Sequence, residues 1–417
     1  MLNKKIAFVG LGYIGLPTAV VMANSGLNVV GIDVKAKNVE CINQGEIPII
    51  EPGLENGLIS ALNSGRFFAT TEYSHADAYI VAVPTPFAEN HDIDMKYIYS
   101  VAESIAEQLK GDELVILEST SPPGTTRRMA ERILEKRPDL VADGDPNPDG
   151  LPVVYFAHCP ERILPGNAMK ELITNDRIIG GETEEATRRA SEIYRSFCEG
   201  KLLATDAMTA EMAKLTENSF RDVNIAFANE LSLISDKLGI DVWELIELAN
   251  HHPRVNILQP GPGVGGHCIA VDPWFIVSAD PANSNLIRTA RQVNDSKPDW
   301  VVDKVREAID SSGTTKVATF GLAFKANIDD LRESPSLAIT RQIAESFPDT
   351  QILAVEPNVA ELPASLSQFG NVSLLDYEKA LGEADVVVVL VDHEEFKDVK
   401  ASTLRGKKII DTKGLWR

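Results

Sequence analysis

A cysteine, Cys268, stands in a stretch rich in glycine and proline, QPGPGVGGHCIAVDPWF at residues 259–275, with Asp272 four positions after it. Because glycine and proline present little side chain, such a loop lets the backbone approach a bound molecule closely. Its thiol is therefore a candidate nucleophile rather than part of a core. A nucleophilic thiol can add to a carbonyl carbon and hold the product as a covalent sulfur adduct.

The N-terminal sequence IAFVGLGYIGLP, residues 6–17, contains the pattern GxGxxG directly after an apolar run. In dinucleotide sites such glycines make a tight turn, leave room for a pyrophosphate and let helix and strand pack closely. Asp33 ends the next strand-like run, where a carboxylate accepts hydrogen bonds from ribose hydroxyls and repels a 2′-phosphate. Glycines that serve only a turn are the alternative, but strand, helix, strand and acid in register favour NAD. The expected cofactor contacts here are Gly10, Gly12, Tyr13, Ile14, Gly15 and Asp33.

Three threonines follow apolar runs, at the place where open α/β sheets bind ligands. Thr85 lies in VAVPTPF at residues 81–87, and Thr120 and Thr126 lie in LESTSPPGTT at residues 117–126. Their hydroxyls could hydrogen-bond the cofactor or a substrate, although serine and threonine at such places also cap helices and turns.

Lys214, Asn218 and Arg221 lie at i, i+4 and i+7 in a long helical pattern, so they share one stripe of the helix. Lysine and arginine at this spacing are common on ordinary helix surfaces. Here the neighbouring residues are mostly apolar, including Leu215 and Phe220, which indicates that the stripe faces protein or ligand. Lys214 is therefore a candidate for proton transfer.

The elements that must position these residues follow an alternating pattern. A strand over 5–9, a helix over 16–25 and a strand over 27–32 form a βαβ unit. Further strands are expected at 78–83, 113–117 and 153–157, and helices at 97–109 and 126–136. They extend a parallel sheet, whereas the acidic, proline-rich residues 139–152 are typical of a solvated loop.

A helical section follows, with one long helix over 207–238 and a shorter one over 241–250. After Lys297 and Pro298 the alternation restarts, with elements at 316–322, 337–346, 351–355, 386–391 and 408–411. The predicted fold is α/β, with two Rossmann-like doubly wound domains joined by a central helical domain. The expected domains are residues 1–203, 204–298 and 299–417. The last one carries no second GxGxxG, so its ligand should be held differently.

The composition of the 417 residues is globular, with 44% hydrophobic and 24% charged residues. A formal charge of −21 argues against nucleic acid and anionic membranes as partners, so an anionic ligand needs a local cluster of arginine and lysine. The apolar N-terminal stretch imitates a signal peptide, but its glycines and the strand that ends at Asp33 indicate a retained, folded segment. No membrane insertion is therefore expected.

The four cysteines are far apart in the sequence, which predicts neither a disulfide framework nor a zinc ribbon and favours a reducing cytoplasm. His251, His252, His267 and Cys268 lack the regular spacing of metal ligands, so no metal is expected.

Motifs along nearly the whole chain resemble those of the UDP-glucose/GDP-mannose dehydrogenases, which oxidise a nucleotide sugar twice at C6. They are GLGYIGLP, VPTP, ESTSPPGT, CPERILPG, the helix that carries Lys214, GGHCIAVDP and FGLAFKANIDDLRESP at residues 320–335. The resemblance implies NAD as cofactor and a UDP-sugar as substrate. It also implies that Cys268 converts an aldehyde into a thiohemiacetal, that a second NAD oxidises this adduct to a thioester, and that water releases the carboxylate.

The same resemblance implies roles for residues at matching positions. Lys214 would transfer a proton and stabilise an oxyanion, and Asp272 would support the acid/base step. Asn218 and Thr120 would place water and oxygen, and Glu161 would take part in hydrolysis. The implied substrate contacts are Arg162, Ile163, Lys214, Asn218, Arg221, His252, Arg254, Gly265, Phe324, Lys325 and Lys413. Arg332 would approach the cofactor from the second doubly wound domain.

Val271 departs from the UDP-glucose branch, which usually has lysine before this aspartate, and so favours a 2-acetamido sugar. The expected substrate is UDP-N-acetyl-D-mannosamine, with UDP-N-acetylglucosamine as the alternative because one C2 stereocentre separates the two. Two other classes remain open. A single-step hydroxyacid dehydrogenase would need no Cys268, and a non-catalytic NAD sensor would need neither Cys268 nor Lys214. The long helix is expected to form a homodimer contact, as in the family.

Overall fold

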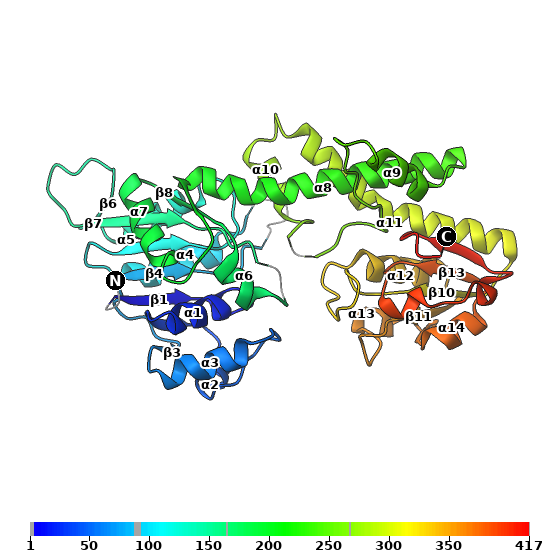
Figure 1. The fold of residues 1–417 in the computed structure, drawn as a ribbon, viewed down its shortest axis with the longest axis horizontal. Coiled ribbons are helices and arrows are strands. Elements are labelled where there is room, and N and C mark those ends of the chain that lie inside the picture. The colour runs from blue at the N-terminus through cyan, green and yellow to red at the C-terminus, as the bar shows by residue number, and fades with distance from the viewer. Residues whose placement is uncertain (1–3, 87–92, 164–165, 267, 417) are drawn as a thin grey trace. The chain divides into compact units, whose positions relative to one another are not determined.

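The computed structural model describes residues 4–86, 93–163, 166–266 and 268–416. The chain forms two compact units (Figure 1). The first unit comprises Met1–Thr216 and Trp274–Ala279, and the second comprises Glu217–Pro273 and Asp280–Arg417. Among the described helices, none combines the length and the apolar character that crossing a bilayer requires.

The first unit is built on a sheet whose strands follow the order β3-β2-β1-β4-β5-β7-β8-β9, with β6 paired to β7. Apolar runs without interruption, such as AYIV in β4 and LVIL in β5, are buried along their whole length because helices cover both faces of the sheet. The strands are β1 Lys5–Val9, β2 Asn28–Ile32, β3 Phe67–Thr70, β4 Ala78–Val81, β5 Leu114–Leu117, β6 Val141–Ala142, β7 Val153–His158, β8 Arg177–Gly181 and β9 Leu202–Asp206.

Two separate hydrophobic cores fill the two sides of this sheet. Helix α1 is almost wholly buried in one core, and α4 and α5 pack together in the other. The order of the strands reverses between β1 and β4, so the loops after these two strands meet at the edge where such sheets bind ligands. The helices of this unit are α1 Gly15–Asn24, α2 Ala36–Asn43, α3 Leu54–Asn63, α4 Lys96–Ala106, α5 Thr125–Lys136, α6 Ala168–Thr174 and α7 Glu184–Tyr194.

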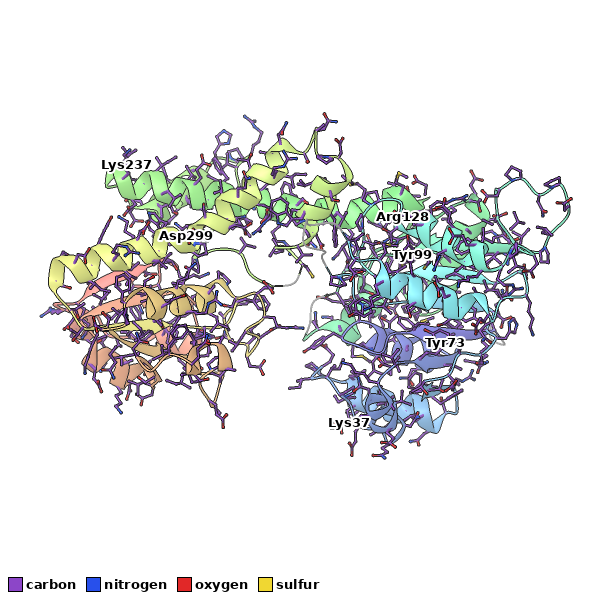
Figure 2. All side chains as sticks on the ribbon, turned by 180° about the vertical axis from the view of Figure 1, so that it is seen from behind. Lys37, Tyr73, Tyr99, Arg128, Lys237 and Asp299 are labelled. Carbon is purple, nitrogen blue, oxygen red and sulfur yellow. The ribbon has the colours of Figure 1, made fainter. Side chains whose placement is uncertain are left out.

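The second unit combines long helices with a smaller parallel sheet of order β12-β11-β10-β13-β14. In both views the second part of α8 runs beside α11, and Figure 2 labels Lys237 on α8 and Asp299 on α11. The remaining helices of the chain are α8 Ala207–Leu238, α9 Val242–Asn250, α10 Asp272–Ala279, α11 Asn285–Ser312, α12 Pro335–Ser346, α13 Ala364–Ser367, α14 Tyr377–Glu383 and α15 Glu394–Lys397. The start of α8, up to Thr216, and most of α10, from Trp274, belong to the first unit. The strands are β10 Lys316–Phe320, β11 Gln351–Val355, β12 Val372–Leu374, β13 Val386–Val389 and β14 Lys408–Asp411.

The predicted fold class is confirmed, since the chain contains two doubly wound sheets with a helical section between them in the sequence. Two local features differ from the expectations. The strands expected to extend the sheet are parallel, but strand β8, which was not expected, runs antiparallel to β7. The helical section was expected to end at Pro298, but helix α11 continues through it. A proline inside a helix removes one backbone hydrogen bond, and here the packing of α11 on both sides of Pro298 outweighs that loss.

Candidate functional site

The glycine turn after β1 shows why two of its glycines are needed for folding and one is not. A Cβ on Gly10, where φ is +95°, would lie 2.2 Å from the Ala82 carbonyl oxygen. A Cβ on Gly15 would lie 1.8 Å from the Gly10 carbonyl oxygen. A Cβ on Gly12 would meet nothing within 4 Å. The bare backbone at Gly12 therefore leaves room for a bound group, as a pyrophosphate requires.

Asp33 stands directly after β2 and is bonded to the same turn. One carboxylate oxygen accepts a hydrogen bond from the Leu11 amide at 3.0 Å, and the other accepts one from the Lys35 amide at 2.8 Å. Both oxygens keep lone pairs for ribose hydroxyls, and the side chain is only half-buried. Together with the space at Gly12, this arrangement fits the diphosphate and adenosine ribose of NAD.

The two threonine loops are joined to each other at the ends of β4 and β5. The Thr85 hydroxyl donates to the Thr120 carbonyl oxygen at 2.8 Å, and the Val83 amide donates to the Ser119 hydroxyl at 2.9 Å. Among the described residues, the Thr120 hydroxyl has no hydrogen-bond partner. It is therefore available to a ligand, whereas the Thr85 hydroxyl already holds the loops together.

Thr126 is bonded to a buried carboxylate that the sequence analysis overlooked. Its amide and its hydroxyl each donate to Glu211 at 2.7 Å, so this glutamate of α8 ties down the start of α5. Burial raises the pKa of Glu211 to about 7, although these bonds oppose the shift. In the sequence, a glutamate among the mostly apolar residues of AEMAKL was the signal that could have indicated a buried carboxylate. Thr126 could serve a cofactor only through its remaining lone pairs.

Glu161 lies in a buried charged cluster at the end of β7. One of its oxygens accepts hydrogen bonds from the amides of Arg162 and Ile163, at 2.7 and 3.1 Å. The other oxygen pairs with the Arg177 guanidinium at 3.0 Å. Arg177 also lies 3.7 Å from Glu118, whose pKa is raised to about 8 by burial and by the nearby Glu161. This cluster fixes the segment that carries the predicted residues Arg162 and Ile163.

In the second unit, the cysteine loop ends in an ordered turn. Cys268 is exposed, and its carbonyl oxygen accepts a hydrogen bond from the Asp272 amide at 2.9 Å, at the start of α10. The Asn218 side chain donates to the Asp272 carboxylate at 2.6 Å. The structure therefore brings together Asn218 and Asp272, two of the residues predicted to serve the reaction. His267 lies outside the described residues.

The same loop packs against the segment after β10, where other substrate contacts were predicted. A Cβ on Gly265 would lie 2.6 Å from the Glu333 carbonyl oxygen and 3.0 Å from the Phe324 Cβ. A Cβ on Gly266 would lie 3.1 Å from the Phe324 ring. Gly265 and Phe324 are thus in contact, and the neighbouring Lys325 is exposed.

Several predicted ligand contacts are exposed or half-exposed basic side chains. Arg332 pairs with Asp330, and Lys413 pairs with Asp392 at 3.1 Å. His252 and Arg254 are exposed after α9, where the Arg254 amide donates to the His252 ring at 3.3 Å.

The remaining predicted contacts lie on the glycine turn and on α8. Tyr13 donates its hydroxyl to the Ile50 carbonyl oxygen at 3.2 Å, and Ile14 precedes α1. Lys214 is half-buried on α8, and Arg221 is exposed.

Comparison with known proteins decides the family. Family models of the UDP-glucose/GDP-mannose dehydrogenases match residues 4–198 as the NAD binding domain, 208–296 as the central domain and 318–417 as the UDP binding domain. The chain belongs to this family.

Three relatives illustrate which proteins this dehydrogenase is similar to. It is 55% identical to a UDP-N-acetyl-D-mannosamine dehydrogenase of Yersinia pestis, over 99% of both chains. It is 52% identical to an NDP-N-acetyl-D-galactosaminuronic acid dehydrogenase of Ralstonia nicotianae, over 99% of this chain and 96% of the relative. A solved UDP-D-ManNAc dehydrogenase of Pyrococcus horikoshii superposes with a TM-score of 0.86 at 38% identity, covering 99% of this chain and 96% of that one.

The dehydrogenase is therefore an NAD-dependent UDP-sugar oxidoreductase, which confirms the predicted cofactor and enzyme class. The residues predicted to serve the reaction divide between the two units. Thr120, Glu161 and Lys214 belong to the first unit, which also carries the glycine turn, and Asn218, Cys268 and Asp272 belong to the second.

Proposed function

We propose that the dehydrogenase oxidises UDP-N-acetyl-D-mannosamine at C6 to UDP-N-acetyl-D-mannosaminuronate, using two NAD per sugar. The observation that carries the proposal is the exposed thiol of Cys268, in a glycine loop next to the bonded pair Asn218 and Asp272. A one-step alcohol dehydrogenase has no need for such a thiol. The relatives named for this substrate support the choice of sugar.

The chemistry assigns each residue a step. NAD, which the glycine turn and Asp33 would hold, would supply the hydride acceptor for both oxidations at C6. In the first, Lys214 takes the proton of the C6 hydroxyl. The Cys268 thiolate then adds to the aldehyde carbon, and the resulting thiohemiacetal loses the second hydride to become a thioester. Water cleaves the C–S bond and restores the thiol, so one alcohol, two NAD and one water yield one carboxylate, two NADH and three protons.

The water and the oxyanion need hydrogen-bonding groups around C6. We assign the placement of water and oxygen to Thr120 and Asn218, and support of the acid/base step to Asp272, which Asn218 holds at 2.6 Å. Glu161 is buried and accepts three hydrogen bonds from its own segment and Arg177. We therefore propose that it serves hydrolysis by holding this segment in place.

Binding of the UDP group is proposed at the basic and backbone positions that match the family. In the second unit, Gly265 and Phe324 are in contact and Lys325 is exposed beside them. Exposed or half-exposed cations supply the positive charge that a diphosphate needs on a chain of net charge −21. They are Arg162, Arg221, Arg254, Lys325 and Lys413, with His252 as a further proposed contact and Arg332 assigned to the cofactor.

Two alternatives have a specific basis. UDP-N-acetylglucosamine differs from the proposed sugar only at C2, and the Ralstonia relative carries a galactosaminuronate name at 52% identity. A hydroxyacid dehydrogenase would form one NADH per substrate instead of two.

The test is to incubate the purified enzyme with UDP-N-acetylmannosamine, UDP-N-acetylglucosamine, UDP-N-acetylgalactosamine and UDP-glucose, and to count the NADH formed per sugar consumed.

We expect two NADH per UDP-N-acetylmannosamine and much slower turnover of the other sugars. Cys268→Ala should stop uronate formation, and Cys268→Ser should fail to complete turnover. Cys41→Ala is the matched control, because Cys41 is a half-buried thiol on α2 of the first unit, outside the proposed site. Uronate production at full rate by Cys268→Ala would refute the sulfur mechanism, and equal turnover of UDP-glucose would refute the sugar assignment.

A homodimer through α8 is proposed from an exposed apolar stripe. Phe220, Phe227 and Ile234 are spaced by seven residues on one helix face and are 71%, 53% and 47% exposed. Leu238 continues the stripe at 65% exposure. Replacing Phe220 and Phe227 by aspartate should produce monomers in light-scattering measurements, and an unchanged mass would contradict this interface.

Two further proposals come from the sequence. They are the division into three domains at residues 203 and 298, and a cytoplasmic location.

A further inference from the structure

The face of α8 opposite this stripe carries three buried polar residues. Asn218, Asp222 and Asn229 are spaced by four and seven residues, so they share one side of the helix. They are 5%, 0% and 0% exposed. Polar groups buried to this extent cost free energy unless they are hydrogen-bonded. Asn218 meets this requirement through Asp272, and the other two belong to a chain of bonds described next.

A continuous chain of hydrogen bonds connects α11 to the cysteine loop through α8. The buried Arg291 donates to Asp222 at 2.5 Å, and Asn294 donates to the same oxygen at 2.8 Å. Asn229 donates to the Asn294 side-chain oxygen at 2.9 Å, and its own side-chain oxygen accepts the Gly261 amide at 2.9 Å. Because Asn294 uses its amino group on Asp222, only its oxygen is left for Asn229. The orientation of the Asn229 amide is thereby determined.

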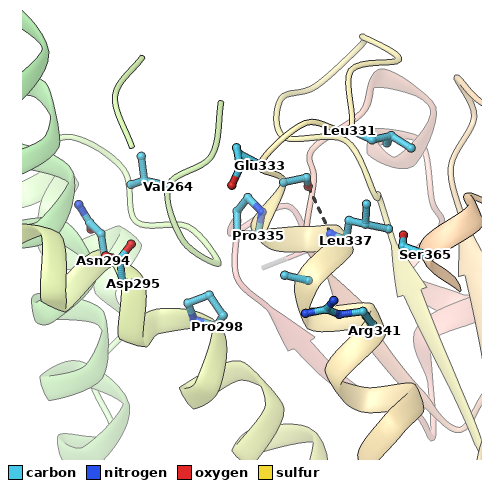
Figure 3. A pocket seen from close by; sticks show the side chains of 12 residues that line it. Val264, Asn294, Asp295, Pro298, Leu331, Glu333, Pro335, Leu337, Arg341 and Ser365 are labelled. Atoms are coloured by element: carbon cyan, nitrogen blue, oxygen red, sulfur yellow. Dashed lines mark hydrogen bonds between the residues drawn. The ribbon is translucent and has the colours of Figure 1, made fainter. Parts of the chain in front are cut away.

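The chain ends on the part of the loop that leads into the thiol. Gly261 stands seven residues before Cys268 and is buried, and a Cβ on the nearby Gly263 would lie 3.3 Å from Pro298 and 2.9 Å from Pro335. Figure 3 shows Val264 of this loop with Asn294, Pro298 and Pro335 around a pocket of about 340 Å³. At the other end of the loop, Asn218 holds Asp272. The loop is thus bonded to one face of α8 at two places, on either side of Cys268.

We propose that Asn229 is a positioning residue for Cys268, and that Asn294 and the Asp222–Arg291 pair act through it by holding its amide toward Gly261. Asn229 itself bonds to the loop backbone at Gly261, to Asn294 of α11 and, through its backbone carbonyl, to Ser232 of its own helix. The consequence for catalysis rests on the proposed function, but the anchoring of the loop does not. Since displacement by about 1 Å can slow a reaction about a hundredfold, the anchor should matter for the steps that use sulfur.

The anchoring is tested without substrate by hydrogen exchange of the purified protein, followed peptide by peptide. In Asn229→Ala we expect amides of residues 259–266 to exchange about tenfold faster, because a local hydrogen bond is lost. Asn224→Ala is the matched control, since the side chain of this asparagine of the same helix donates to the Phe220 carbonyl oxygen of its own helix. Asn294→Ala gives a second route if Asn229→Ala does not fold, and it should cause a smaller change in the same peptide.

Steady-state kinetics then distinguish a misplaced Cys268 from a general loss of structure in the variant. Asn229→Ala should lower kcat about 10- to 100-fold while leaving KM for NAD unchanged, because the glycine turn belongs to the other unit. Unchanged exchange in residues 259–266, equal acceleration throughout the second unit, or the same effects in Asn224→Ala would overturn the proposal. If no UDP-sugar is oxidised by the wild type, the proposed function fails while the exchange data still decide the anchor.

Discussion

Asp33 and Glu356 occupy equivalent places in the two sheets. Each directly follows the second strand of its sheet, and each carboxylate accepts backbone hydrogen bonds from the turn after the first strand. Asp33 accepts the Leu11 amide at 3.0 Å, and Glu356 accepts the Leu322 amide at 2.8 Å. The turns also begin alike, because Gly10 and Gly321 both have a φ of +95°. The amide of each glycine donates to the carbonyl oxygen of the last residue of the second strand at 2.8 Å.

The two carboxylates differ in what else surrounds them. Glu356 is 4% exposed and bonds to the buried His393 ring at 3.1 Å, whereas Asp33 is half-buried. The other nitrogen of His393 accepts the Asn327 amide at 3.0 Å, which fixes the loop that follows Phe324 and Lys325. The second sheet thus has the same glycine turn as the dinucleotide site of the first. Its acid, Glu356, is bonded to His393 and so stabilises the loop at Asn327. This agrees with the match of residues 318–417 to a UDP binding domain.

The glycine turn predicts opposite outcomes for two similar substitutions. Gly15→Ala should lower the Tm strongly, because its Cβ would overlap the Gly10 carbonyl oxygen at 1.8 Å. Gly12→Ala should leave the Tm nearly unchanged, because its Cβ meets nothing within 4 Å, but should weaken NAD binding by filling the pyrophosphate space. Thermal melts and NAD titrations of both variants measure this. Normal NAD affinity in a folded Gly12→Ala protein would contradict the placement of the pyrophosphate.

Replacement of Asp33 tests the assignment of the adenosine ribose. Asp33→Ala removes the acceptor for two hydroxyls, so KM for NAD should rise about 10- to 100-fold while the preference for NAD over NADP shrinks. Asp149→Ala is the control, since Asp149 is exposed in the loop between β6 and β7. The measurement is steady-state kinetics with both cofactors. An unaltered preference for NAD would mean that another group excludes the 2′-phosphate.

Much of this architecture was predictable from local patterns. Strand β1 and helix α8 were predicted with the bounds that they have, because one is a short apolar run and the other a long periodic pattern without a breaker. The glycine turn and Asp33 were predictable because their chemistry depends on residues close in sequence. Cys268 and Asp272 were likewise marked by their unusual loop.

The long-range polar contacts were not predictable in this way. Asn229, Asn294 and His393 resemble ordinary helix and loop residues until the fold brings their partners from 32 to 66 residues away. The helical section was expected to end at Pro298, whereas α11 continues through this proline because packing along the helix sustains it. Local propensity is weaker than tertiary contacts at such positions.

Glu356 should make the second unit less stable in acid. Burial alone would raise its pKa, but hydrogen bonds from His393 and two backbone amides outweigh this and lower the pKa from 4.5 to about 2. An acid with a lowered pKa stabilises the fold above its unfolded pKa, and this contribution is lost as the pH falls from 4.5 toward about 2. The shift corresponds to about 3 kcal/mol.

We therefore expect Glu356→Gln to lower the free energy of unfolding at neutral pH, and the difference from wild type to vanish between pH 4.5 and about 2. Urea unfolding over a pH series measures this. Glu361→Gln, at an exposed position, should show no such difference. A difference that stays constant across this range would show that charge is not what Glu356 contributes.

Lys297 should give a pH dependence of the same sign as Glu356, but at alkaline pH. This buried ammonium donates to the Ser232 hydroxyl at 2.5 Å and lies 3.8 Å from the centre of the Trp300 ring. Burial lowers its pKa from 10.5 to about 8, although Asp236 opposes the shift. Between these values the unfolded chain binds the proton and the native protein does not, so the free energy of unfolding rises with pH.

Lys297→Met removes this titration. We expect the free energy of unfolding of the wild type, relative to Lys297→Met, to rise by up to about 3 kcal/mol between pH 8 and 10.5. Other groups that titrate in this range cancel because both proteins contain them. Lys237→Met serves as the control, since Lys237 is exposed near the end of α8 and should leave the pH profile of the wild type unchanged. A relative stability that falls with pH would mean that the native protein keeps Lys297 charged, held by the Trp300 ring and Asp236 more strongly than burial opposes it.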